Sequence, residues 1–224
     1  MMKMMKRIAG VLGSALIYIS SAGFTSSSFS LAKLQNYYKE FRSAPIEVAS
    51  SSSIKTYEDY RGITAVNSAQ YQYIHNHMTV DQTTGMLYDE DGFIGVALGY
   101  NFGDIGTRYY FELDTGITIP VVKVDAKAAV DASDGWTANS NGSVLEFVID
   151  SDLATSYFGG TNGLASSGNF NNYEYLKGNI VGIELVSDEK ADDGSIVYET
   201  KQTAGVKSDE DSDHIQVVQG GYSD

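Results

Sequence analysis

The chain has 224 residues and contains 29 Asp and Glu against 15 Lys and Arg, so its formal net charge is −14. This charge disfavours contact with nucleic acids and with anionic membrane surfaces, and neither is expected as a partner. The chain has no Cys, which excludes disulfides, thiol catalysis and a lipid-modified N-terminal cysteine.

Residues 1–22 have the three parts of a secretory signal peptide. Lys3, Lys6 and Arg7 form a positive start, residues 8–19 are apolar, and residues 20–22 are small. The apolar run is shorter than the roughly 20 residues that span a bilayer, so cleavage is preferred to an uncleaved membrane anchor. Removing the three cations changes the formal charge from −14 to −17. We expect a secreted or cell-wall-associated bacterial protein, with no membrane insertion after signal removal.

Composition divides the rest of the chain into three parts. Residues 23–53 are predicted to hold an amphipathic helix and a Ser-rich linker, because Leu31, Leu34, Tyr38 and Phe41 recur at helical spacing within residues 30–41. Residues 54–186 are predicted to form a β-barrel domain with an N-terminal arm. Residues 187–224 are predicted to form an acidic hairpin and a solvated tail.

The arm, residues 54–86, is polar and rich in Tyr. Alternation of Tyr71, Tyr73 and His75 predicts an irregular strand that packs on the barrel. On a strand, His75 and His77 would share one face within reach of one metal ion. Spacing identifies no third ligand, so a pair of surface histidines is preferred and no metal is expected.

The barrel domain is read from short apolar runs separated by turn sequences, which predict a mainly β protein. The strands are expected at residues 93–98, 108–113, 117–124, 144–149 and 180–186. Residues 151–157 are predicted to form a core helix capped by Ser151 or Asp152. Residues 159–172 are predicted to form a surface loop.

Several segments of this domain carry a resemblance. The sequences at residues 96–99, 105–109, 116–125 and 145–150, with flanking segments at 60–64, 68–71 and 176–180, resemble an uncharacterised family of secreted bacterial and phage-associated proteins. That family is similar in turn to double-psi β-barrels, which include the 3D domains and the barrel of a class of lytic transglycosylases. The resemblance implies a double-psi-like six-stranded β-barrel that acts on cell-wall glycan.

The same resemblance suggests two acidic site residues. Asp125 corresponds to the aspartate that opens a Gly-rich loop in the 3D domains, and Glu146 stands at their closing Ile-Asp. Gly99 stands where another aspartate is expected, and residues 126–129 replace the Gly-Gly segment. In those transglycosylases a carboxylic acid of raised pKa protonates the glycosidic oxygen. Glu146, in an otherwise apolar strand, is predicted to be this acid, with Asp125 as its partner.

Two alternatives remain for the acidic pair and its surroundings. Glu146 could be a solvated residue on an outer strand face, and Asp125 could cap a turn. Lys127, Tyr100 and Trp136 are predicted substrate contacts, the aromatic rings as platforms for sugar faces, although core packing is the alternative for such rings.

The sequence favours no cofactor. It lacks a nucleophile elbow, a P-loop and a dinucleotide-binding fingerprint. The expected function is therefore an exported cell-envelope protein that contacts peptidoglycan or a related glycan, with or without lytic-transglycosylase-like activity. The alternative is a non-catalytic surface or matrix protein that self-associates.

Overall fold

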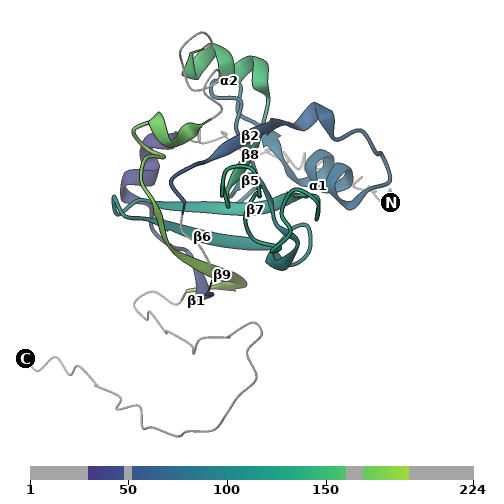
Figure 1. Ribbon diagram of the computed structural model, residues 1–224. Coiled ribbons are helices and arrows are strands. Elements are labelled where there is room, and N and C mark those ends of the chain that lie inside the picture. Colours follow the sequence, from purple (N-terminus) through teal and green to yellow (C-terminus); the bar gives the residue numbers. More distant parts are fainter. Residues whose placement is uncertain (1–29, 48–51, 160–168, 192–224) are drawn as a thin grey trace, which may run out of the picture.

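The computed structural model describes residues 30–47, 52–159 and 169–191. The predicted signal peptide and the predicted acidic tail lie outside the described residues. The described part is mainly β, as predicted, and its strands belong to one mixed sheet (Figure 1). The strands are β1 (Phe41–Pro45), β2 (Thr56–Asp59), β3 (Thr79–Val80), β4 (Leu87–Tyr88), β5 (Ile94–Leu98), β6 (Arg108–Leu113), β7 (Thr118–Ala126), β8 (Glu146–Ile149) and β9 (Ile180–Lys190).

Helices are few in the described residues. The α-helices are α1 (Ala69–His77) and α2 (Ser151–Phe158), and the 3₁₀ turns are η1 (Leu31–Asn36), η2 (Tyr60–Gly62), η3 (Tyr100–Phe102) and η4 (Phe170–Asn172). Helix α2 matches its predicted range closely, but its cap is Asp150, whose side chain accepts hydrogen bonds from the amides of Asp152 and Leu153.

The sheet branches instead of closing. Its strands follow the order β1-β9-β6-β7-β5-β4-β3. One edge of β5 pairs in parallel with β7, and the other edge is divided between β4 and β8. Strand β8 then pairs in parallel with β2. No pairing among the described strands joins the two ends of this path, so the predicted six-stranded barrel is not confirmed.

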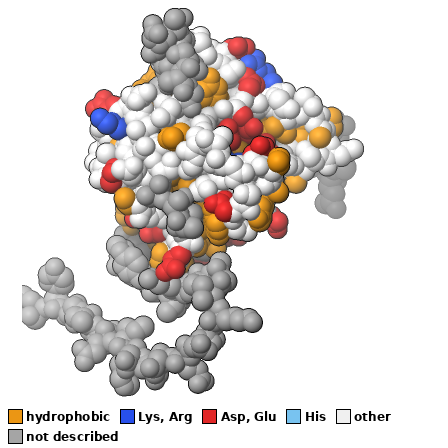
Figure 2. All heavy atoms as spheres, in the orientation of Figure 1, with side chains coloured by type: hydrophobic (Ala, Val, Ile, Leu, Met, Phe, Trp, Pro, Cys, Tyr) orange, Lys and Arg blue, Asp and Glu red, His pale blue; other side chains and the backbone are white. Residues whose placement is uncertain are grey.

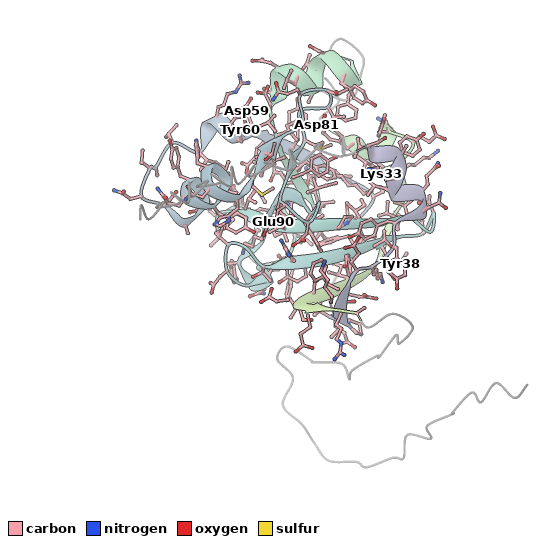
Figure 3. All side chains as sticks on the ribbon, turned by 180° about the vertical axis from the view of Figure 1, so that it is seen from behind. Lys33, Tyr38, Asp59, Tyr60, Asp81 and Glu90 are labelled. Atoms are coloured by element: carbon pink, nitrogen blue, oxygen red, sulfur yellow. The ribbon has the colours of Figure 1, made fainter. Side chains whose placement is uncertain are left out.

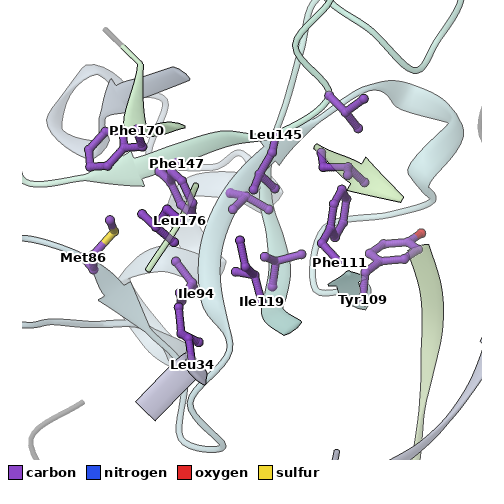
Figure 4. Close-up of a cluster of buried hydrophobic side chains, with 14 of the residues drawn as sticks. Leu34, Met86, Ile94, Tyr109, Phe111, Ile119, Leu145, Phe147, Phe170 and Leu176 are labelled. Carbon is purple, nitrogen blue, oxygen red and sulfur yellow. The ribbon is translucent and has the colours of Figure 1, made fainter. Parts of the chain in front are cut away.

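Apolar side chains cover both faces of the central strands. Along β6, Tyr109 and Phe111 belong to the larger core cluster, whereas Tyr110 between them belongs to a second cluster on the opposite face. Figure 4 shows the larger cluster, to which Leu34, Phe170 and Leu176 contribute from outside the sheet. Burial on both faces explains why β5 is a continuous apolar run and why most of β7 is apolar without alternation.

The N-terminal segment differs from its prediction. Its helical part is the short 3₁₀ turn η1, which ends at Asn36, and Phe41 begins strand β1. Leu31 and Leu34 are buried, but Tyr38 is 67% exposed and lies at the surface (Figure 3). A spacing of three residues suits a 3₁₀ turn as well as an α-helix. Pairing of β1 with β9 then takes Phe41 into the sheet, so this segment is part of the sheet and not an extension of it.

The prediction for the arm, residues 54–86, was also wrong in part. It contains strand β2 and then helix α1, whose N-cap Ser68 accepts a hydrogen bond from the amide of Tyr71. Residues two apart on an α-helix point about 200° apart, so His75 and His77 do not share a face. His75 stacks on Tyr71, and the ring of His77 lies against that of Tyr73.

Two further differences from prediction lie near the C-terminal end of the described residues. Phe170 lies within the predicted surface loop, yet it is buried against Phe147 and Tyr57. Strand β9 continues to Lys190, through residues predicted as an acidic turn, because its C-terminal part pairs with β1.

Candidate active site

Four strands bring together side chains that lie far apart in the sequence. Asp125 on β7 is opposite Ala97 on β5, and Ala97 is opposite Glu146 on β8. Glu146 is in turn opposite Thr56 on β2. Residues directly opposite each other in a sheet share a face, so these four form one row. The prediction that Asp125 and Glu146 come together on the folded chain agrees with this register.

A β-bulge sets the position of Asp125 in that row. Val96 pairs with Lys123, but the next residue, Ala97, pairs with Asp125, which leaves Val124 as an extra residue in β7. Such a bulge changes the direction in which the following side chain points. Ala97 has only a methyl group, so the space between the carboxyl groups of Asp125 and Glu146 is left open.

This row forms one wall of a cavity of about 560 Å³. The volume falls within the roughly 300–1,000 Å³ that is usual for sites of small ligands. Figure 2 shows acidic side chains gathered in a hollow over the region of β2, β8 and β5. The opposite wall is polar and comes from the connection between β7 and β8, with Lys127, Asp131, Asn139, Ser140, Asn141 and Ser143 in the lining.

A further carboxyl group, Glu58 on β2, lines the same cavity. Burial, a hydrogen bond to Asp125 and the negative charges of Asp125 and Glu146 raise the pKa of Glu58 to about 8, while Lys127 opposes the shift. A pKa of about 8 favours the protonated form of Glu58 at neutral pH. Its Oε1 atom is buried without a hydrogen-bond partner in the described structure.

Contact between Glu58 and Asp125 shows how the sheet is shaped here. Strands β8 and β5 separate β2 from β7 in the pairing order. The two side chains can meet only if these four strands curve around the cavity, as twisted sheets do. The pair is therefore a product of sheet curvature, and no local sequence pattern around Glu58 indicates it.

Lys127 supplies a buried positive charge next to the acids. Its Nζ atom donates hydrogen bonds to the backbone carbonyl of Ser143 at 2.9 Å and to Ser143 Oγ at 3.2 Å. The side chain is 8% exposed, and burial lowers its pKa, against the attraction of Glu146 and Glu58. Lys127, a predicted substrate contact, lines the cavity.

The two predicted aromatic contacts lie elsewhere. Trp136 does not line this cavity, and its ring packs edge-on against Phe102 with 4.8 Å between centroids. Tyr100 is half exposed, also outside the cavity lining, and its hydroxyl donates to the carbonyl of Ser133. Core packing, the alternative weighed for these rings, describes Trp136 better than a sugar platform does.

The surroundings of Gly99 leave no room for an aspartate at this position. A Cβ atom on Gly99 would overlap the carbonyl group of Gly135, and the amide of Asn101 donates a hydrogen bond to the same carbonyl. The loop that contains Trp136 thus rests directly on the backbone at Gly99. Any side chain there would push away the connection that forms the polar wall.

Among the described residues, no group of three or more His, Cys, Asp or Glu side chains has the geometry to hold a metal ion. None of the helices in that part of the chain is long and apolar enough to cross a membrane.

Comparison with known protein families, with curated proteins and with solved structures gives no match for this chain. The resemblance to cell-wall proteins stays a prediction from short sequence segments. The function must be inferred from the cavity and its side chains.

Proposed function

We propose that this protein is an exported cell-envelope protein that binds a glycan in the cavity and cleaves a glycosidic bond, with Glu58 as the proton donor. The observation that supports this is a cavity large enough for sugar units, lined by several carboxyl groups, in which burial and the neighbouring Asp125 raise the pKa of Glu58 to about 8. Cleavage of a glycosidic bond needs an acid that stays protonated near neutral pH and a nearby carboxylate.

The chemistry follows from this division of roles. The protonated carboxyl group of Glu58 donates its proton to the glycosidic oxygen as the bond from that oxygen to the anomeric carbon breaks. The bonding electrons leave with the oxygen, and the carboxylate of Asp125 stabilises the positive charge that develops on the sugar. The nucleophile is water or a hydroxyl of the sugar itself, and it returns a proton to Glu58 as its bond to the anomeric carbon forms.

The remaining lining suits a carbohydrate. The hydroxyl of Ser140 and the side-chain NH₂ of Asn141 offer an acceptor and donors, which sugar hydroxyl groups require, whereas the amide of Asn139 already bonds Ser133 and Val130 within the wall. The hydroxyl of Thr56 is buried and without a partner in the described structure, so it is available to a ligand hydroxyl. The assignment moves the acid from Glu146, where the sequence placed it, to Glu58.

The test is release of soluble fragments from purified insoluble peptidoglycan. The wild-type protein should release fragments, and Glu58→Gln should reduce the rate by about 10²- to 10⁴-fold, the usual contribution of a general acid. Glu174→Gln, the same substitution at an exposed position, is the matched control. Turnover should also fall as the pH rises through about 8, since the pKa of Glu58 is about 8.

The outcomes separate the functional classes. Equal release by wild type and Glu58→Gln would remove the catalytic role of Glu58. Protein that pellets with the cell wall without release would be a glycan binder. Protein that does neither would favour the alternative, a non-catalytic surface or matrix protein that self-associates.

A further inference from the structure

The charge of the cavity is unbalanced. Its lining contains four carboxyl side chains, Glu58, Asp125, Asp131 and Glu146, and a single cationic one, Lys127. Even with Glu58 protonated, three carboxylates outnumber one ammonium group. In the described part of the chain, neither Asp125, Asp131 nor Glu146 forms an ion pair with Lys or Arg.

The cations near these acids are directed into the protein. The Nζ atom of Lys127 is held by Ser143. Lys123, which is attracted by Asp125, is 2% exposed and donates to the carbonyls of Gly99 at 3.0 Å and Gly103 at 2.7 Å. Both ammonium groups are already bound by oxygen atoms of the protein. A ligand in the cavity therefore meets carboxylates more readily than it meets cations.

Two further atoms indicate that the cavity is built for a ligand. Thr56 Oγ1 and Glu58 Oε1 are buried and lack hydrogen-bond partners, and both residues belong to the lining. Buried polar atoms in folded proteins nearly always have partners, and exceptions are typical of functional sites. These atoms belong to β2, on the same wall as Glu146.

We propose that the cavity selects an amino sugar with a free, protonated amine, as in a de-N-acetylated glycan, and that Glu146 and Asp131 bind this amine. The inference deepens the proposed function and rests on it for the choice of a sugar. Glu58, which is uncharged, and Asp125 remain at the bond to be cleaved. Glu146 is separated from Asp125 by the methyl group of Ala97, and Asp131 belongs to the opposite, polar wall, so the amine lies between the two walls and beside the reacting bond.

The chemistry discriminates against related ligands. An N-acetyl group replaces the cation with a neutral amide, which loses the attraction to both carboxylates and leaves them desolvated. An anionic sugar would be repelled by the same charges. A cationic peptide meets the charge requirement but lacks the hydroxyl groups that suit Ser140 and Asn141.

The test compares the affinity of two defined probes by isothermal titration calorimetry. The probes are the tetramer of glucosamine and the tetramer of N-acetylglucosamine, measured at about pH 6, where a primary amine is charged. The full chain is used as wild type and as Glu58→Gln, which prevents turnover during the titration. We expect the glucosamine tetramer to bind at least about tenfold more tightly, with a preference that weakens between about 20 and 200 mM salt.

Variants assign the preference to this cavity. Glu146→Gln and Asp131→Asn should each reduce affinity for the glucosamine tetramer by about threefold to tenfold and leave affinity for the acetylated tetramer unchanged. Lys127→Met removes the positive charge of the lining and should increase affinity for the glucosamine tetramer. Glu174→Gln should change neither. A circular-dichroism melt of each variant shows whether it is folded.

The result can overturn the inference separately from the proposed function. Equal or tighter binding of the acetylated tetramer, or no binding of either probe, overturns the amine preference, even if peptidoglycan is cleaved. A preference for the glucosamine tetramer that is insensitive to Glu146→Gln and Asp131→Asn also overturns it. A preference that depends on these residues supports it, even when no fragment is released from any glycan.

Discussion

Asp89 and Glu58 are both acids withdrawn from water, yet their surroundings differ. Burial raises the pKa of each carboxyl group. Asp89 is bound by Arg108 Nε at 2.9 Å and Nη2 at 2.6 Å, and it accepts a hydrogen bond from the amide of Phe93 at 2.8 Å. Glu58 has another carboxyl group as its partner and one oxygen with none. The first acid is fully compensated, whereas the second retains capacity for a ligand.

The same contrast holds for half-buried charges at the far end of the sheet. Glu112 and Glu184 lie near the pairing of β6 with β9, and Lys39 bridges them at 2.6 and 2.9 Å. No such cation stands between Asp125 and Glu146 in the described residues. The carboxyl groups of the cavity differ from these because several of them gather in one hollow without a matched cation in the described part of the chain.

The largest expected effect comes from breaking the compensated pair. Arg108→Met should destabilise the protein by about 3–5 kcal/mol, because Asp89 would remain buried without its cation. Urea unfolding at neutral pH measures the change. Arg42→Met, which removes a half-exposed cation near Glu189, is the control and should cost less than about 1 kcal/mol. Equal losses in the two variants would contradict the assignment of Asp89 as a structural acid.

A smaller and pH-dependent effect is expected at Glu58. The pKa of Glu58 is about 8 in the folded protein, against an ordinary value of 4.5. Between pH 4.5 and about 8, the folded protein therefore holds a proton on Glu58 that the unfolded chain has lost. The contribution of Glu58 to stability is therefore greatest below pH 4.5 and falls as the pH rises to about 8. Glu58→Gln should be about 2–3 kcal/mol more stable than wild type at about pH 9, and this advantage should vanish near pH 4.5.

Urea unfolding of wild type and Glu58→Gln at a series of pH values measures this difference. Glu174→Gln, at an exposed carboxyl group, should follow the wild-type curve. Parallel curves for wild type and Glu58→Gln would show that Glu58 titrates at its ordinary value, and would remove the acid from the proposed mechanism.

The smallest expected effect concerns the loop that forms the polar wall. Gly99→Ala should cost about 1–2 kcal/mol, because the new methyl group overlaps the carbonyl of Gly135. Gly62→Ala is the matched control, since a Cβ atom there meets nothing within 4 Å. Thermal unfolding compares the two. Loss of glycan binding in Gly99→Ala without the same loss in Gly62→Ala would show that this contact positions the cavity wall.

The local sequence pattern predicted those strands and helices whose conformation does not depend on contacts with distant residues. Strand β6 has the predicted bounds, and the cores of β5, β7, β8 and helix α2 were anticipated, because apolar runs between turn residues form strands in any register. Prediction failed where two conformations suit one spacing. The Leu31 and Leu34 pattern fits a 3₁₀ turn, and the Tyr71 and Tyr73 alternation is overridden by the cap at Ser68.

The sequence by itself determined a mainly β protein, its negative charge, and the choice of Asp125 and Glu146 as acids worth attention. Only the tertiary structure decided that β5 divides its edge between β4 and β8, that a bulge at Val124 turns Asp125 towards the cavity, and that Glu58 joins it. The physical reason is that a side chain's face depends on local alternation, whereas its partners depend on pairing between distant strands. Glu58 is identified as the buried acid only by the pairing of β2 with β8 and by the curvature of the sheet.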